Sequence, residues 1–164
     1  MSKLFIGYKQ YGEIMNQLVN SLYKVGMQTQ NYIFSHVYGV PRGGLSIATH
    51  ISHNMNLEMT NLYKFMNRDW YDGLNLLVVD DIVDTGKTFE DLGDELLNIA
   101  DRCPTFNYKF LSIHYKPRSI FKPDIFFQEV NNSTWVVYPW ECDDERCEQD
   151  RVDFSKRREL IEPK

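Results

Sequence analysis

The sequence has too few basic residues and too few apolar runs for several classes of protein. Lys and Arg number 18 against 23 Asp and Glu, a formal net charge of −5, whereas binding to nucleic acid or a membrane surface usually needs a basic face. No apolar run approaches the length of a membrane span, and the first residues lack the apolar stretch of a signal peptide. We therefore expect a cytoplasmic protein with no nucleic-acid or membrane partner.

Cysteine is also scarce, with only Cys103, Cys142 and Cys147. The odd count and the wide spacing argue against a disulfide framework. Cys142 and Cys147 are separated by four residues, but a zinc site usually needs a second such pair, and the chain has none. The thiols therefore disfavour a metal site and fit a reducing compartment.

The remaining composition is that of one globular domain, with 164 residues of which 43% are hydrophobic and 25% charged. Apolar periodicity predicts helices over 13–25, 45–55 and 88–100. Apolar runs between turn signals predict strands over 32–38, 57–65, 74–79, 108–113, 125–130 and 135–138. This alternation predicts an α/β fold with a mostly parallel central sheet flanked by helices, whose ligands bind beyond the carboxyl ends of the strands. We expect the domain to cover residues 1–145, with a charged tail or helix over 146–164.

One segment, LVVDDIVDTGKT at 77–88, ends in the letters of a nucleotide triphosphatase phosphate loop. That loop reads G-x-x-x-x-G-K-[ST], and five positions before Gly86 this chain has Asp81 where the loop needs glycine. A carboxylate there would face the phosphates that the loop binds. An ATPase is therefore the least favoured of the functions considered.

The same segment offers a different site. A strand buried on both faces is expected to end at Asp80 and Asp81, and Asp84 and a Thr-Gly-Lys-Thr turn follow. Hydroxyl and N–H groups at the start of a helix attract a phosphate, whereas carboxylates suit sugar hydroxyls and Mg²⁺. This order of groups favours a sugar phosphate over a bare triphosphate.

The segment resembles the phosphoribosyl pyrophosphate signature of the type I phosphoribosyltransferases. GVPRGGL at 39–45 resembles the pyrophosphate loop of that family. HYKP at 114–117 and TWVVYPWE at 134–141 resemble the purine-binding elements of the xanthine-guanine and hypoxanthine enzymes. The resemblance implies a single-domain phosphoribosyltransferase fold with a small purine-binding hood, formed by segments near 1–12 and 114–141.

The resemblance further implies a transfer of ribose 5-phosphate from phosphoribosyl pyrophosphate to guanine, xanthine or hypoxanthine, with Mg²⁺ as cofactor. Asp84 would be the catalytic acid or base. The ribose and its 5-phosphate would be bound by Asp80, Asp81, Thr85, Gly86, Lys87 and Thr88. The pyrophosphate would be bound by Arg42, Gly43 and Gly44.

Two further groups of residues follow from the resemblance. Lys116 would donate to the purine 6-oxo group, Trp135 would stack on the base, and the backbone of Val136 would contact the edge of the base. Without the motif, Lys116 would be an ordinary exposed lysine and Trp135 a core aromatic residue. Metal ligands would be Asp80, Asp81 and Glu141.

The chain departs from the family in the hood that precedes the acid segment. The interval from 63 to 75 is short and lacks the Ser-Tyr pair that active members often carry. A phosphoribosyltransferase-fold module that binds phosphoribosyl pyrophosphate or a nucleotide without turnover is therefore the alternative function. Family members usually form homodimers or homotetramers, and Phe126, Phe127 and Tyr138 are candidates for subunit contacts or for core packing.

Overall fold

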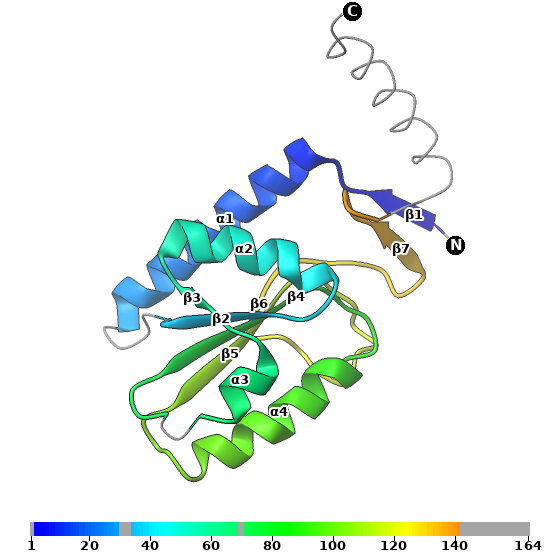
Figure 1. Cartoon of the computed structure of the whole chain (residues 1–164). Helices are drawn as coiled ribbons and strands as arrows, with labels where there is room; N and C mark the ends of the chain where they lie inside the picture. Colours follow the sequence, from blue (N-terminus) through cyan, green and yellow to red (C-terminus); the bar gives the residue numbers. More distant parts are fainter. Residues whose placement is uncertain (1, 30–33, 69–70, 142–164) are drawn as a thin grey trace, which may run out of the picture.

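One central sheet lies between two layers of helix in the computed structural model, which describes residues 2–29, 34–68 and 71–141 (Figure 1). The sheet has five strands in the order β3-β2-β4-β5-β6, and each neighbouring pair is parallel. Its strands are β2 (His36–Gly39), β3 (Glu58–Met59), β4 (Asn75–Val83), β5 (Asn107–Tyr115) and β6 (Ile125–Glu129). The predicted α/β fold with a mostly parallel sheet is confirmed.

Helices cover both faces of this sheet. α1 (Tyr8–Thr29) and α2 (Gly43–Met55) lie on one face, while α3 (Leu62–Met66) and α4 (Lys87–Ala100) lie on the other (Figure 1). Each predicted helix is present, although α1 extends beyond its predicted bounds at both ends and α2 starts two residues earlier than predicted. No helix among the described residues is both long enough and apolar enough to cross a membrane.

The side chains of β4 explain its continuous apolar run. Leu77 and Val79 are fully buried in the core beneath α1 and α2, whereas Leu76 and Val78 are fully buried in the core beneath α3 and α4. Successive side chains of a strand point to opposite faces, so a strand covered on both sides must be apolar at every position. The central position of β4 in the sheet could therefore be predicted from its apolar run.

One predicted boundary is wrong, and one expected short strand occupies only part of its segment. β4 continues to Val83, so the acid pair lies within the strand and not after it. The strand predicted over 57–65 is limited to Glu58–Met59, and α3 follows. The side chain of Asn61 accepts the backbone N–H of Lys64 at 2.7 Å, and such an N-cap starts a helix where propensity alone suggested a strand.

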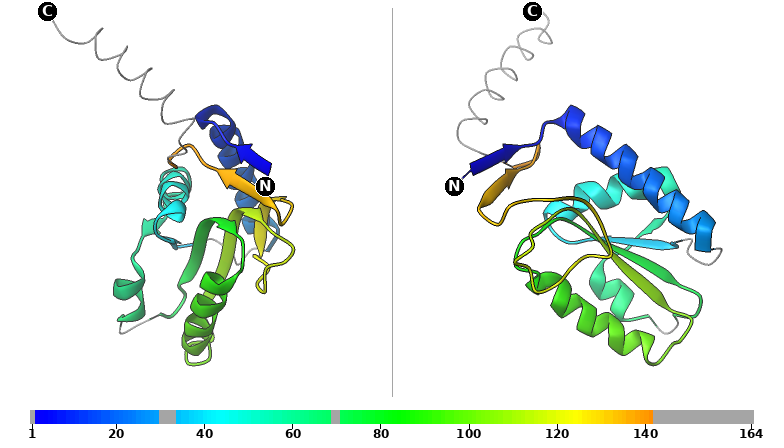
Figure 2. Two further views of the ribbon diagram at one scale, coloured as in Figure 1. Left: turned by 90° about the vertical axis from the view of Figure 1, so that its right-hand side faces the viewer. Right: turned by 180° about the vertical axis from the view of Figure 1, so that it is seen from behind.

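A second, smaller sheet stands apart from the first. β1 (Ser2–Phe5) pairs in parallel with β7 (Thr134–Val137), and both views of Figure 2 place this pair to one side of the central sheet. Both strands fall in the segments for which a hood is predicted, and the domain bounds stay a prediction. The predicted tail at 146–164, with Cys142 and Cys147, lies outside the described residues.

Candidate active site

The carboxyl ends of β2 and β4 meet at one edge of the sheet. Gly39 pairs with Val79, so the PRGG loop that follows β2 lies beside the acids that follow Val79. A cleft of about 620 Å³ opens there. Its lining includes five of the predicted site residues, namely Arg42, Gly43, Asp80, Asp81 and Glu141.

Two glycines allow the loop and the acids to approach closely. A Cβ on Gly43 would lie 2.0 Å from Asp81 Oδ2, so only a residue without a side chain leaves room for that carboxylate. A Cβ on Gly44 would lie 2.2 Å from the carbonyl oxygen of Val79, in the strand itself. The N–H of Gly44 donates to the carbonyl of Val40 at 2.9 Å, and Pro41, Arg42 and Gly43 of this loop line the cleft.

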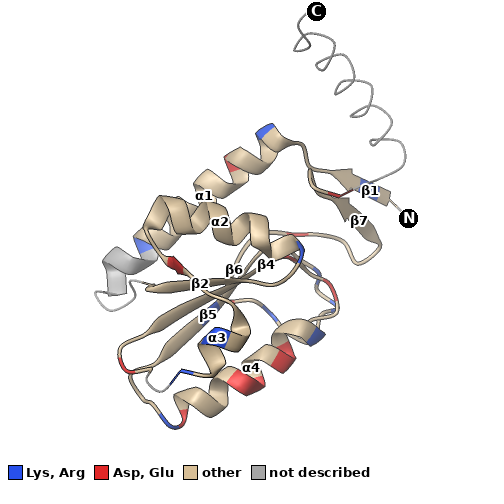
Figure 3. Ribbon diagram, viewed as in Figure 1, with Lys and Arg blue, Asp and Glu red and all other residues tan. Residues whose placement is uncertain are grey.

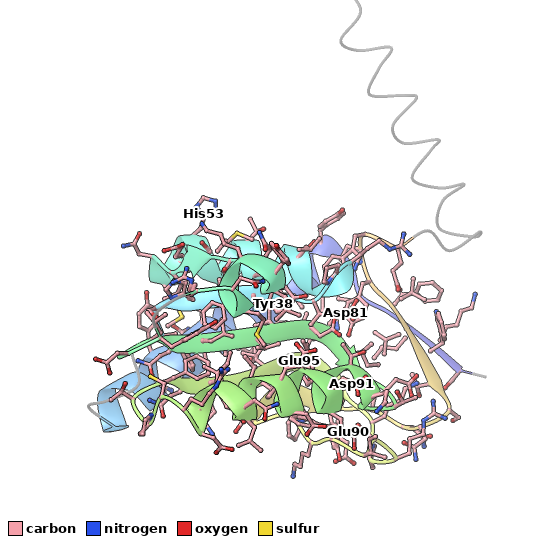
Figure 4. The ribbon with its side chains drawn as sticks, turned by 60° about the horizontal axis from the view of Figure 1, so that its bottom comes forward. Tyr38, His53, Asp81, Glu90, Asp91 and Glu95 are labelled. Atoms are coloured by element: carbon pink, nitrogen blue, oxygen red, sulfur yellow. The ribbon has the colours of Figure 1, made fainter. Side chains whose placement is uncertain are left out.

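The acid pair is held in a partly buried position at the end of β4, where Figure 4 labels Asp81. The N–H of Asp81 donates to Asp80 Oδ1 at 2.9 Å, and the N–H of Ile82 donates to Asp81 Oδ1 at 2.8 Å. Burial, followed by the charge of Asp81, raises the pKa of Asp80 well above its usual range. Burial and the charge of Glu141 also raise the pKa of Asp81. A cation bound beside these two carboxyl groups would stabilise their ionised forms.

A second, smaller cleft of about 120 Å³ adjoins the first at the start of α4. It is lined by Asp80, Ile82, Val83, Asp84, Thr85, Gly86, Thr88 and Phe89. Gly86 is the N-cap of α4 with φ of 86°, a left-handed conformation that favours glycine. The predicted phosphate turn therefore presents hydroxyls and N–H groups at the positive end of a helix.

Lys87 is the exception among the residues of this turn. Its Nζ lies 3.1 Å from Glu90 Oε2 and 2.7 Å from Asp91 Oδ1, on the acidic outer surface of α4 (Figures 3 and 4). The ammonium group therefore pairs with acids of its own helix, unlike the lysine of a triphosphatase loop, which reaches the phosphates. This geometry adds a structural reason to reject the ATPase reading.

Asp84 is bound by two basic residues from the loop after β5. Lys116 Nζ donates to Asp84 Oδ2 at 2.9 Å, while Arg118 Nε donates to Asp84 Oδ1 at 3.0 Å and Arg118 Nη2 donates to the same oxygen. Burial alone would raise the pKa of Asp84, but the hydrogen bonds and charges of Lys116 and Arg118 outweigh it and lower that pKa. Lys116 is 4% exposed, so it is a buried residue and not an ordinary surface lysine.

The predicted base-binding residues lie on β7. Trp135 is 49% exposed, so it is not the core aromatic residue of the alternative interpretation. Val136 is buried and pairs with Leu4 of β1. Trp140 and Glu141, which follow β7, line the larger cleft, so this segment borders the acid pair.

Three residues near the site were not predicted to bind ligand or to take part in catalysis. Arg118 binds Asp84, and its position two residues after Lys116 was the only signal. His114 on β5 and Tyr138 after β7 are buried and hydrogen-bonded to each other beneath the acid pair. Tyr138 therefore belongs to the core of this chain and is not a surface residue available for a subunit contact.

Comparisons with known proteins find relatives of one kind, although no protein-family model matches the chain. The chain is 26% identical over 133 residues to a xanthine-guanine phosphoribosyltransferase of Cereibacter sphaeroides, covering 71% of this chain and 74% of the relative. It is 27% identical over 121 residues to the enzyme of the same name from Idiomarina loihiensis, covering 64% and 70%.

Solved structures show the same fold. The purine phosphoribosyltransferase of Pyrococcus horikoshii superposes with a TM-score of 0.70 at 23% identity, over 87% of this chain and 97% of that one. The xanthine-guanine-hypoxanthine phosphoribosyltransferase of Helicobacter pylori gives 0.66 at 22% identity, over 90% and 99%. The chain is therefore similar in sequence to xanthine-guanine phosphoribosyltransferases and has the type I phosphoribosyltransferase fold of these solved structures.

Proposed function

We propose that this chain transfers ribose 5-phosphate from phosphoribosyl pyrophosphate to a ring nitrogen of an oxo-purine. The bond from the ribose anomeric carbon to the pyrophosphate oxygen breaks, and a bond to the purine nitrogen forms. The purine loses a proton, and pyrophosphate leaves. The observation that carries this proposal is the order of groups along one sheet edge: arginine and glycine, acid pair, phosphate turn, and a lysine bound to an aspartate.

The phosphate turn suits the 5-phosphate end of the substrate. Thr85, Gly86 and Thr88 line the smaller cleft at the start of α4, where hydroxyls, N–H groups and the helix dipole all favour an anion. Lys87 contributes through its backbone, because its side chain is paired with Glu90 and Asp91. The ribose would then lie over Asp80 and Asp81, whose oxygens can accept its hydroxyl hydrogens.

The larger cleft suits the leaving group. Arg42 can direct a planar pair of N–H donors at phosphate oxygens, and Gly43 lets the backbone approach them. Asp80, Asp81 and Glu141 have the oxygen ligands that Mg²⁺ prefers, and a bound cation would favour the ionised forms of the two aspartates, whose pKa values burial raises. When bound, Mg²⁺ would neutralise the charge that develops on pyrophosphate.

These carboxylates do not form a complete metal cage by themselves. Among the residues that the structure describes, no three His, Cys, Asp or Glu side chains are grouped so that they could hold a metal ion. Mg²⁺ usually keeps several waters and binds through one or two carboxylates together with substrate phosphates. The site therefore fits an ion that arrives with phosphoribosyl pyrophosphate.

The base end is organised by Asp84. Because Lys116 and Arg118 hold it ionised, Asp84 acts as an acceptor that fixes or removes a proton on the purine ring. Lys116 has three N–H donors and uses one on Asp84, so it can still donate to a 6-oxo oxygen. The 6-amino group of adenine is itself a donor, so the lysine favours oxo-purines. Exposed Trp135 offers a face for stacking, and the backbone of Val136 contacts the edge of the base.

The decisive experiment is a base panel. The protein is incubated with phosphoribosyl pyrophosphate, Mg²⁺ and guanine, xanthine, hypoxanthine or adenine in turn, and nucleotide and pyrophosphate are measured. We expect product with at least one oxo-purine, little with adenine, and a large loss in the Asp84→Asn variant. Binding of phosphoribosyl pyrophosphate without product from any oxo-purine would instead establish the non-catalytic module.

We further propose a cytoplasmic homodimer or homotetramer. Several large apolar side chains are exposed on the single chain, including Phe5, Tyr8, Tyr63 and Ile120. Burying such side chains against a second copy would remove apolar area from water. Sedimentation of the protein at several concentrations would give the assembly, and a monomer at every concentration would contradict it.

A further inference from the structure

A buried chain of hydrogen bonds runs beneath the acid pair. His114 Nδ1 lies 2.6 Å from Tyr138 Oη, and Tyr138 Oη donates to the backbone carbonyl of Asp81 at 2.7 Å. His114 is 0% exposed and Tyr138 is 1% exposed. A polar group is seldom placed so deeply unless its hydrogen bonds are satisfied, so this chain is a specific feature of the fold.

The direction of each hydrogen bond follows from which of the three groups carries a hydrogen. The carbonyl of Asp81 can only accept, so the single proton of the Tyr138 hydroxyl is donated to it. The Tyr138 oxygen must then accept from His114, which places a hydrogen on Nδ1. Burial lowers the pKa of His114 to about 4, so the ring is neutral near pH 7 and its Nε2 carries no hydrogen. Within the described part of the chain, that buried Nε2 has no hydrogen-bond partner.

The carbonyl of Asp81 needs this partner because of where β2 ends. Among the described strands, the last pair between β2 and β4 joins Gly39 to Val79, so β2 provides no strand partner to Asp81. The hydroxyl of Tyr138 donates a hydrogen bond to the carbonyl of Asp81, beyond the last residue of β4 that pairs with β2. It thereby helps to fix the backbone that carries the acid pair.

Tyr138 is also tied to the base-binding segment. It immediately follows β7, on which Trp135 and Val136 lie. Its N–H donates to Glu141 Oε2 at 3.0 Å, and its ring stacks on Trp140 with centroids 5.1 Å apart and planes 3° apart. Trp140 and Glu141 line the larger cleft together with the acid pair. One side chain thus joins the purine side of the site to the pyrophosphate side.

We propose that Tyr138, oriented by His114, is a positioning residue that couples purine binding on β7 to phosphoribosyl pyrophosphate binding at Asp80 and Asp81. The inference rests on the proposed function. A base that stacks on Trp135 stabilises β7 and the turn after it, and the hydroxyl of Tyr138 then holds the acid pair in the geometry that the sugar and its cation require. Each ligand should therefore bind more tightly in the presence of the other.

The test measures this coupling directly. Calorimetry gives the Kd of phosphoribosyl pyrophosphate with Mg²⁺, with and without a purine analogue in which carbon replaces the accepting nitrogen, so that no transfer occurs. In the unmodified protein the analogue should lower that Kd. In Tyr138→Phe, which keeps the ring and its stacking on Trp140, the lowering should shrink by about 3- to 10-fold, the effect of one net hydrogen bond.

Two further variants separate positioning from general damage. Tyr115→Phe also removes the hydroxyl of a buried tyrosine, but one on β5 whose ring packs on Phe126, and should leave the coupling unchanged. His114→Asn keeps an N–H close to the position of Nδ1 and should retain more coupling than His114→Ala. In ¹⁵N NMR spectra, the histidine signal that His114→Asn removes should be that of a neutral ring protonated on Nδ1.

The outcomes distinguish this inference from the proposed function. No nucleotide product from the unmodified protein would overturn the proposed function. An active unmodified protein whose coupling is the same in Tyr138→Phe and Tyr115→Phe would overturn the inference alone. Equal weakening of both ligands in Tyr138→Phe with unchanged coupling would also overturn it, because the tyrosine would then be purely structural.

Discussion

Replacing Asp80 with asparagine should stabilise the ligand-free protein while it removes transferase activity. Asp80 is held near Asp81 in a partly buried site that raises its pKa, so the folded state resists ionisation of this carboxyl. The amide oxygen of asparagine can still accept the N–H of Asp81, so the local hydrogen bond survives. The substitution therefore removes an electrostatic cost and little else from the ligand-free state.

The size and the pH dependence of this gain follow from proton linkage. Below the ordinary pKa of 3.8, Asp80 is protonated in both the folded and the unfolded chain, so the two states do not differ. As the pH rises, the unfolded chain releases its proton first, and each unit of raised pKa costs the folded state about 1.4 kcal/mol. Because the pKa of Asp80 is raised from 3.8 to about 8, we expect Asp80→Asn to gain up to about 4 kcal/mol near neutral pH, which raises Tm by up to about 8–16 °C for a chain of this length.

The assay is urea and thermal unfolding in EDTA, at several pH values from about 4 to about 7. The exposed carboxylate Asp94 on α4 supplies the control, because Asp94→Asn removes the same charge without relieving the acid pair. The gain from Asp80→Asn should grow with pH and should exceed that of the control. A variant no more stable than the unmodified protein at neutral pH, or a gain independent of pH, would refute the reasoning.

Three further results are expected. Arg118→Gln should raise the pKa of Asp84 and move the acid limb of the pH profile of kcat/KM to higher pH, whereas Arg102→Gln, an exposed arginine, should not. Lys87→Ala should change the KM for phosphoribosyl pyrophosphate by less than about threefold, because exposed ion pairs contribute little. A rise in KM of more than about tenfold would instead indicate that the Lys87 side chain contacts a phosphate. Because burial lowers the pKa of His114, its contribution to the free energy of unfolding, about 3 kcal/mol, should be present above pH 6.5 and be lost as the pH falls through about 4. His114→Asn should flatten that part of the stability curve, and an unchanged curve would contradict the assignment.

The sequence predicted the sheet because burial and periodicity act locally. The run before Asp80 is buried on both faces, and a strand of this kind is apolar at every position of the sequence. The turn at Gly86 was also predictable, since a glycine between two threonines at the end of a strand indicates a phosphate-binding helix start. These features depend on neighbours in the chain.

The remaining features depend on residues that are distant in sequence. The ion pairs of Asp84 with Lys116 and Arg118 join residues more than thirty positions apart, and no local pattern marks such a partner. The role of Tyr138 depends on β2 ending at Gly39, which fixes where a carbonyl of β4 loses its strand neighbour. The end of a neighbouring strand is set by tertiary packing, so it could not be deduced from Tyr138 or its surroundings in the sequence.

The pairing of β1 with β7 bears on the order in which the site is assembled. Ser2 lies beside Thr134 across a separation of 132 residues, and closing so long a loop costs entropy before any contact repays it. We therefore expect β7 to pair with β1 only after the central sheet has brought these segments together. The phosphate turn at Thr85–Thr88 is built from adjacent residues, whereas the strand that carries Trp135 needs a partner 132 positions away.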